Sequence, residues 1–263
     1  MMISQQQSWH EAIGVRHARR SFDATSLPTD ELDALEACCR EFRPFGDLAR
    51  TVLVREAPQR LFMGVAGSYG GISGAPSALA FVGIKGAPHV QAAVGYTGEG
   101  LVLEATARGL DTCWVGGMFN ARHAALLGGI GERERVYAVS PLGHAAAGIT
   151  TKEQVVFRMG RPKFRRALDE IAPGNGAWPA WARAGVEAAQ VAPSALNRQP
   201  WRFRLDAGAV IVSAEGVDTP RVSKRLDCGI AMLHFELGAR SAGADGTWEF
   251  LDGRDAARWV PAG

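Results

Sequence analysis

A short polar stretch between two prolines, residues 192–201, carries side chains well suited to hold a ligand and reads Ala-Pro-Ser-Ala-Leu-Asn-Arg-Gln-Pro-Trp. Pro193 and Pro200 each disfavour helical geometry in the residue before them, so the chain is extended at both edges. Between them, Ser194 and Asn197 have short polar side chains that favour turns and can bind nearby polar groups. A rigid polar loop between a helix and a strand suits a ligand, but a plain proline-stiffened connection explains the same residues.

A basic run near the start of the chain, Arg16-His17-Ala18-Arg19-Arg20, is a second group able to do chemistry. Arg16, Arg19 and Arg20 share one face if the preceding helix continues, and like charges at that spacing repel by about 0.2–0.5 kcal/mol per pair. A phosphate among them relieves this repulsion, which makes the run a candidate anion site. A solvated basic helix end, favoured by the helix dipole, is the alternative.

Two further groups can complete a ligand site. Lys163 and Arg165 are two residues apart, so an extended chain points both side chains the same way. They can meet the same phosphate, or they can belong to a solvated linker. Gly116 and Gly117 have no side chains, so their backbone can approach a flat ring closely. A Gly-Gly turn at the end of a strand is the alternative there.

These motifs together resemble the nitroreductase family. Residues 192–201 match its flavin-contacting loop, Ala-Pro-Ser-x-x-Asn-x-Gln-Pro-Trp, and the run from Arg16 to Arg20 resembles its Arg-x-Ser-x-Arg motif, which holds the phosphate and ribityl chain of FMN. Ala18 stands where that motif has serine, so one hydroxyl contact is lost. Residues 109–118 resemble the family segment Gly-Leu-x-x-x-Trp-x-Gly-x-Phe, where a backbone N–H contacts flavin N5. The cofactor-binding residues implied are Arg16, His17, Arg20, Gly116, Gly117, Lys163, Arg165, Pro193, Ser194 and Asn197.

The order of the motifs departs from the family pattern, in which the ring loop follows the basic motif closely. Here the corresponding early segment, residues 43–46, lacks the serine and asparagine, and the ring loop lies in the last third of the chain. The chain therefore resembles the single-chain pseudo-dimer branch of the family, with an internal duplication. Residues 1–171 form a first half with the phosphate motif, residues 178–263 a second, degenerate half with the ring loop, and one complete site lies between them.

The resemblance implies an α+β nitroreductase-like fold of two similar halves in one compact unit, each a mixed β-sheet packed with helices around a long central helix. The sequence agrees, because residues 90–108 form a long apolar helix rich in small residues and ended by Gly109. Residues 226–239 look like its second copy, with Gly229 in the place of Gly98. Ser8 with Glu11 fits a capping box, which predicts a helix start at Ser8.

Composition narrows the class of protein. The 263 residues are 47% hydrophobic, which is enough for a large core, and a net charge of +2 does not favour nucleic acid as a partner. The four cysteines have no paired metal spacing and indicate thiols in a reducing cytosol. No signal peptide or membrane-length apolar run is evident, so we expect a cytoplasmic protein with no membrane partner. We expect no metal, and the resemblance to the pseudo-dimer branch implies a monomer.

The resemblance implies an FMN-dependent oxidoreductase that takes hydride from NADH or NADPH through flavin N5 and passes it to a small-molecule acceptor in a ping-pong scheme. FMN binding at micromolar affinity needs about −8 kcal/mol, whereas one charge-assisted hydrogen bond contributes about 1.5–3 kcal/mol, so several contacts are required. No catalytic side chain is demanded, and Arg20 is the candidate cation near the flavin ring. The alternatives are a non-catalytic flavin-binding protein, or another flavin reaction such as dehalogenation or flavin breakdown.

Overall fold

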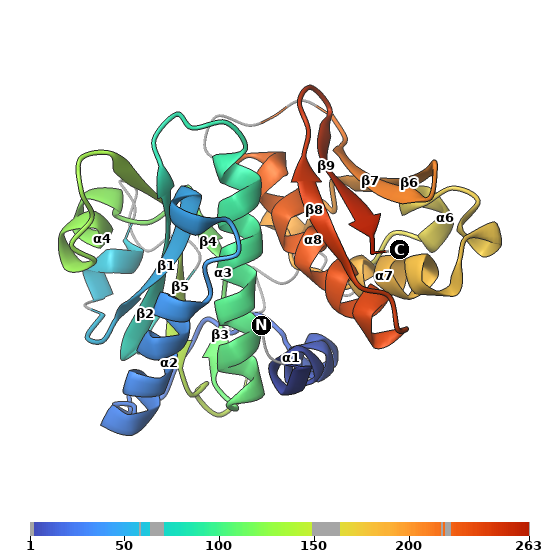
Figure 1. Ribbon diagram of the computed structural model, residues 1–263. Coiled ribbons are helices and arrows are strands. Elements are labelled where there is room, and N and C mark those ends of the chain that lie inside the picture. The colour runs from blue at the N-terminus through green and yellow to red at the C-terminus, as the bar shows by residue number, and fades with distance from the viewer. Residues whose placement is uncertain are drawn as a thin grey trace.

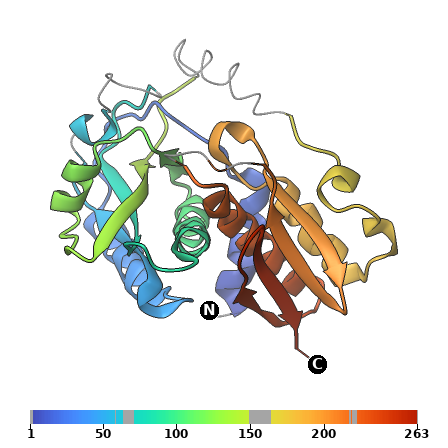
Figure 2. The same ribbon diagram turned by 90° about the horizontal axis from the view of Figure 1, so that it is seen from above.

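Two β-sheets flank a central pair of long helices in the computed structural model (Figure 1). The structure describes residues 3–57, 59–63, 71–148, 164–216, 218 and 222–262. The central helices are α3 (Val90–Ala107) and α8 (Lys224–Ser241), which pack along each other. The view from above shows the same arrangement, with helix α1 (Ile3–Val15) lying between the two halves and contacting both central helices (Figure 2).

The two sheets have the same strand order. The first runs β1-β2-β5-β3, with β4 also paired to β5, and the second runs β6-β7-β9-β8. The strands of the first sheet are β1 (Ala49–Val54), β2 (Ser77–Ile84), β3 (Asp111–Thr112), β4 (Val115–Gly116) and β5 (Glu134–Gly143). Those of the second are β6 (Trp201–Asp206), β7 (Ala209–Ala214), β8 (Gly246–Phe250) and β9 (Asp255–Pro261). The named strands pair antiparallel throughout, and the parallel contacts of the first half are single bridges made by Ala18 and Ser21.

The helices repeat in the same order as the strands. Helix α2 (Thr29–Glu41) precedes β1 as α7 (Ala180–Gln190) precedes β6, and α3 follows β2 as α8 follows β7. The predicted α+β class with a long central helix in each half is therefore confirmed. Two short helices, α4 (Ala121–Leu127) and α6 (Leu168–Ile171), also lie in the part of the chain that the structure describes, and α6 contacts α7 and β6.

Glycines bring the central helices into backbone contact. A Cβ atom on Gly229 would lie 2.0 Å from the carbonyl oxygen of Ala92, and one on Gly95 would lie 2.0 Å from that of Leu226. Gly95 and Gly229 therefore take corresponding places in the two helices at their crossing. The predicted correspondence of Gly229 with Gly98 is wrong. A Cβ on Gly98 would instead meet the rings of Trp114 and Phe81, 2.6 and 2.8 Å away.

A buried polar chain also joins the halves at this crossing. Glu99 of α3 and His234 of α8 are fully buried, with Oε1 of the glutamate 2.9 Å from Nε2 of the histidine. The other carboxylate oxygen of Glu99 accepts a hydrogen bond of 2.6 Å from Nε1 of Trp114. Neither the carboxyl group of Glu99 nor the ring of His234 can reach water, so each depends on these hydrogen-bond partners. The pair thus joins α3, α8 and the strand region near β4.

Helix boundaries follow the sequence closely except at the first helix. Gly109 has φ +78° directly after α3 and its capping residue, which confirms the predicted glycine stop. Helix α1 begins at Ile3 rather than at Ser8, so the predicted capping box is wrong and Ser8 lies within the helix. The helix also ends at Val15, and therefore the basic run that follows has no common helical face.

The core is shared by the two halves. One cluster of buried side chains reaches from Trp9 of α1 through Phe81 of β2 to Phe235 of α8 and Trp259 of β9. The four cysteines are all buried thiols. Across the described ranges, no helix combines the length and apolarity needed to span a bilayer, and no group of three or more metal-binding side chains is found.

Candidate functional site

The loop that joins α7 to β6 is held in an uncommon backbone conformation. Leu196, Asn197 and Gln199 have φ angles of +52°, +52° and +46°, a region that residues other than glycine rarely adopt. The extended conformation predicted for Gln199 before Pro200 is therefore wrong. The hydroxyl oxygen of Ser194 accepts a hydrogen bond of 3.0 Å from the backbone N–H of Gln199, which closes the turn. Backbone strain of this kind persists only where surrounding contacts hold it, and it clusters at functional sites.

Two arginines from distant parts of the chain lie close enough near this loop for their charges to interact. Arg165 donates from Nη1 to the side-chain oxygen of Asn197 at 3.0 Å and to the carbonyl of Ala192 at 3.1 Å. Burial lowers the pKa of Arg165, and the positive charge of Arg16 lowers it further. Arg16 of the first half therefore lies within electrostatic reach of Arg165 and the loop.

The guanidinium of Arg16 has a donor that is available to a ligand near this loop. Its Nε atom is buried and has no hydrogen-bond partner among the described residues. A buried donor without a partner costs about 1–3 kcal/mol, and two neighbouring guanidinium groups add repulsion to that cost. An anion between Arg16 and Arg165 would satisfy the donor and cancel the repulsion.

The rest of the basic run follows an extended path beside β3. Ala18 forms a bridge with Thr112, and the backbone carbonyl of Arg20 accepts a hydrogen bond of 2.9 Å from Ser73. Arg19 donates from Nη2 to the carbonyls of Ala146 and Gly148, both at 2.9 Å. The ring of His17 is exposed, and its Nδ1 lies 2.8 Å from the carbonyl of Val15. Lys163, the other cation predicted for the site, lies outside the described residues.

The glycines predicted to contact a ring reach the same region from the first sheet. Gly116 ends β4, which pairs with β5, and Gly117 turns the chain with φ +78°. A Cβ on Gly116 would lie 3.1 Å from Cγ2 of Val222, which precedes α8 in the second half. The guanidinium of Arg198 donates a hydrogen bond of 3.1 Å to the carbonyl of Val222. The strand β4 and the loop after α7 are thus joined through Val222.

Three polar residues that support the loop were not predicted as site residues. Gln199 is 1% exposed, its Oε1 accepts from the backbone N–H of Arg166, and its Nε2 donates to the carbonyls of Phe164 and Asn197. Arg198 donates from Nε to Oδ2 of Asp227 at 2.7 Å. Gln199 and Arg198 lie within the motif at residues 192–201, so the sequence could have identified them. No spacing in the sequence marks Asp227 as the partner of Arg198.

The buried carboxyl of Asp227 makes stability depend on pH. Burial raises the pKa of Asp227 from 3.8 to about 6, against the opposing charge of Arg198. The folded state therefore holds this proton more tightly than the unfolded chain does. We expect the wild type to gain stability relative to an Asp227→Asn variant as the pH falls from about 7 to about 4, by roughly 3 kcal/mol at most. Urea unfolding of both proteins across this range measures the difference, and a difference independent of pH would contradict the raised pKa.

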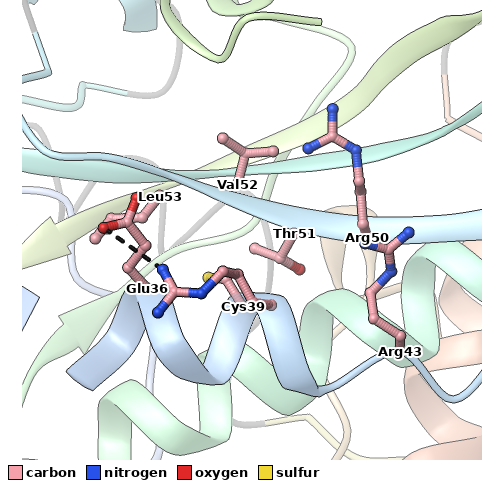
Figure 3. A pocket seen from close by; sticks show the side chains of 8 residues that line it. Glu36, Cys39, Arg43, Arg50, Thr51, Val52 and Leu53 are labelled. Atoms are coloured by element: carbon pink, nitrogen blue, oxygen red, sulfur yellow. Dashed lines mark ion pairs between the residues drawn. The ribbon is translucent and has the colours of Figure 1, made fainter. Parts of the chain in front are cut away.

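A small cavity lies elsewhere, between α2 and β1 (Figure 3). Its volume of about 150 Å³ is below the roughly 300 Å³ at which small-molecule pockets begin. The lining residues are Glu36, Cys39, Arg40, Arg43, Arg50, Thr51, Val52 and Leu53. None of them belongs to the predicted site, so the candidate site rests on the convergence of Arg16, Arg165 and the loop rather than on this cavity.

The equivalent loop of the first half, which follows α2, is filled by aromatic rings. The ring of Phe45 lies 5.1 Å from that of Tyr96 on α3 and 4.7 Å from that of Phe250 on β8. Phe250 also stacks on His89 at 5.3 Å with an interplanar angle of 5°. The two related loops therefore differ: one is polar and flanked by arginines, the other is packed with apolar rings.

Comparison with known proteins identifies a family that matches most of the chain and solved structures of similar fold. A family model described as "Putative TM nitroreductase" matches residues 9–239. A crystal structure of a "putative nitroreductase" from Thermotoga maritima is 22% identical and superposes with a TM-score of 0.62, over 96% of this chain and 93% of that one. A nitroreductase with bound FMN from Bacteroides fragilis is 17% identical, with a TM-score of 0.42 over 54% of this chain and 90% of that one. A comparison with curated proteins gave no match.

Proposed function

Since the chain belongs to the TM nitroreductase family, we propose that it is an FMN-dependent oxidoreductase that uses NADH or NADPH to reduce a small-molecule acceptor. The observation that supports this most directly is the meeting of Arg16 and Arg165 beside the loop. These residues are far apart in the sequence. A pair of neighbouring cations, one of which has a buried N–H with no partner in the described part of the chain, is suited to an anionic group.

The residues present fit the phosphate of FMN. Arg16 and Arg165 would hold the phosphate oxygens by charge-assisted hydrogen bonds, each contributing about 1.5–3 kcal/mol. Asn197 accepts from Arg165 and donates from Nδ2 to the carbonyl of Phe164 at 2.9 Å. We assign Asn197 the role of orienting Arg165 toward the phosphate. His17, Arg20 and Lys163 remain proposed members of this anion site.

The ring would lie between the loop and β4. Ser194 accepts a hydrogen bond from Gln199 and keeps its own hydroxyl proton to donate, and Pro193 holds the start of the loop extended. The backbone of Gly116 or Gly117 would donate to flavin N5, because a glycine lets the main chain approach the ring closely. Bound FMN supplies hydride transfer in two half-reactions, from the nicotinamide and then to the acceptor.

A single flavin per chain follows from the difference between the two halves, which we propose to be residues 1–171 and 178–263 of an internal pseudo-dimer. A common dimer of this family has two equivalent sites at its interface. Here the aromatic rings of Phe45, Tyr96 and Phe250 occupy the region related to the polar loop. The monomer would therefore contain one complete site.

The visible absorption spectrum of the purified protein, with the flavin released and counted, tests this function. We expect one FMN per chain, taken up from solution if it is lost in purification, and bleaching of its absorption by NADH or NADPH in a stopped-flow experiment. A protein that neither contains nor binds FMN would refute the proposal. Two flavins per chain would refute the single site, and binding without bleaching would leave a flavin-binding protein instead of an enzyme.

A further inference from the structure

The loop after α7 needs outside support for its shape. Leu196, Asn197 and Gln199 all have positive φ angles within four positions, and Leu196 is 78% exposed, so its own side chain packs against little. Residues in this region of backbone space persist only where surrounding contacts over-determine them. The contacts that hold this loop are therefore part of the site's construction.

Asp227 supplies two of these contacts from the first turn of α8. Its Oδ1 accepts from the backbone N–H of Ala195 at 3.1 Å, and its Oδ2 accepts from Nε of Arg198 at 2.7 Å. The side chain of Asp227 is 1% exposed. The carboxylate thus binds the loop on both sides of Leu196 and Asn197, the first two of the residues with positive φ.

Arg198 extends this support to the first half of the chain. While Nε binds Asp227, Nη2 donates to the carbonyl of Val222 at 3.1 Å. The side chain of Val222 lies over Gly116, so close that a Cβ on Gly116 would meet it at 3.1 Å. One guanidinium group therefore connects the polar loop with the segment that packs against β4.

We propose that Arg198 and Asp227 are a positioning pair that holds the loop and Val222 at the spacing FMN needs, without either residue contacting the flavin. This inference rests on the proposed function. A buried ion pair contributes little net stability compared with apolar residues of similar size. Here both partners also bind backbone atoms on either side of the site, so their main effect is on geometry.

The test compares three variants by FMN titration, followed through quenching of flavin fluorescence and the absorption of the bound flavin. Arg198→Met keeps the length of the side chain but removes every hydrogen bond. Arg198→Lys keeps a charge opposite Asp227 but lacks the planar guanidinium that donates to Asp227 and Val222 from two separate nitrogens. Arg204→Met is the matched control, because Arg204 pairs with Asp255 at 2.8 and 2.7 Å on the same half and is not part of the proposed site.

We expect Arg198→Met to weaken FMN binding about ten- to hundredfold, Arg198→Lys to recover part of that loss, and Arg204→Met to bind as the wild type does. Thermal unfolding without FMN shows whether each variant folds. An Asp227→Asn, Arg198→Met double variant should lose clearly less affinity than the sum of the two single losses, because the two residues act as a unit.

The outcomes separate this inference from the function itself. Wild-type affinity in Arg198→Met would overturn the positioning role while the proposed function stands. Equal losses in Arg198→Met and Arg198→Lys, accompanied by a large fall in unfolding temperature that Arg204→Met does not share, would show a purely structural role and also overturn it. Absence of FMN binding in the wild type would overturn the proposed function.

Discussion

Replacing Arg16 with methionine is expected to weaken FMN binding about ten- to hundredfold while leaving the protein without FMN as stable as the wild type, or more stable. Arg16 has a buried Nε without a hydrogen-bond partner among the described residues, and its charge disfavours the protonated form of Arg165. Removing it relieves both costs in the empty site and removes a phosphate ligand from the filled one. The two effects therefore have opposite signs.

The opposite signs make the experiment decisive. FMN affinity is measured by fluorescence titration, and stability by chemical unfolding in the absence of FMN. Arg40→Met is the control, because the side chain of Arg40 on α2 is 67% exposed and lies outside the proposed site. Unchanged affinity in Arg16→Met would show that Arg16 does not bind the phosphate. A marked loss of stability without FMN would show that Arg16 is a structural residue.

A Gly229→Ala variant is expected to lose about 3 kcal/mol of unfolding free energy or more. The added Cβ would lie 2.0 Å from the carbonyl oxygen of Ala92 and 2.9 Å from the backbone nitrogen of Tyr96. These are backbone atoms of α3, so no side chain can rotate away and the two central helices must separate. Urea unfolding followed by circular dichroism measures the loss.

Gly14→Ala is the matched control for this substitution. Gly14 lies in α1, has no atom within 4 Å of the position of an added Cβ, and is exposed. Alanine favours a helix there, so this variant should gain about 0.5–1 kcal/mol. If Gly229→Ala were within 1 kcal/mol of the wild type, about the size of the control effect, the close crossing of α3 and α8 would be wrong.

The same crossing controls the proposed site. Arg16 follows α1, which packs on both central helices, whereas Arg165 and the loop belong to the part of the chain around α7 and α8. Separating α3 from α8 therefore changes the distance between Arg16 and Arg165. We therefore expect the folded fraction of Gly229→Ala to bind FMN less tightly than the wild type does, so the loss is not explained by unfolding alone.

Much of this architecture could be predicted from residues that are neighbours in the chain. The helix predicted over residues 90–108 is observed as Val90–Ala107, and the helix predicted over residues 226–239 lies within the observed Lys224–Ser241. Hydrophobic periodicity and turn residues act over a few neighbouring positions, so they can be recognised in the sequence without knowledge of the rest of the fold. The polar loop was found for the same reason, because its residues lie together in one motif.

Contacts between distant residues could not be predicted in this way. Nothing in the sequence places Arg16 beside Arg165, pairs Asp227 with Arg198, or sets Gly95 rather than Gly98 against Gly229. These pairings depend on how two helices and two sheets pack, and a shift of one helical turn would exchange one partner for another. Local chemistry therefore identified which groups could bind FMN, whereas the packing of α3 against α8 determined which of them lie close enough to act together.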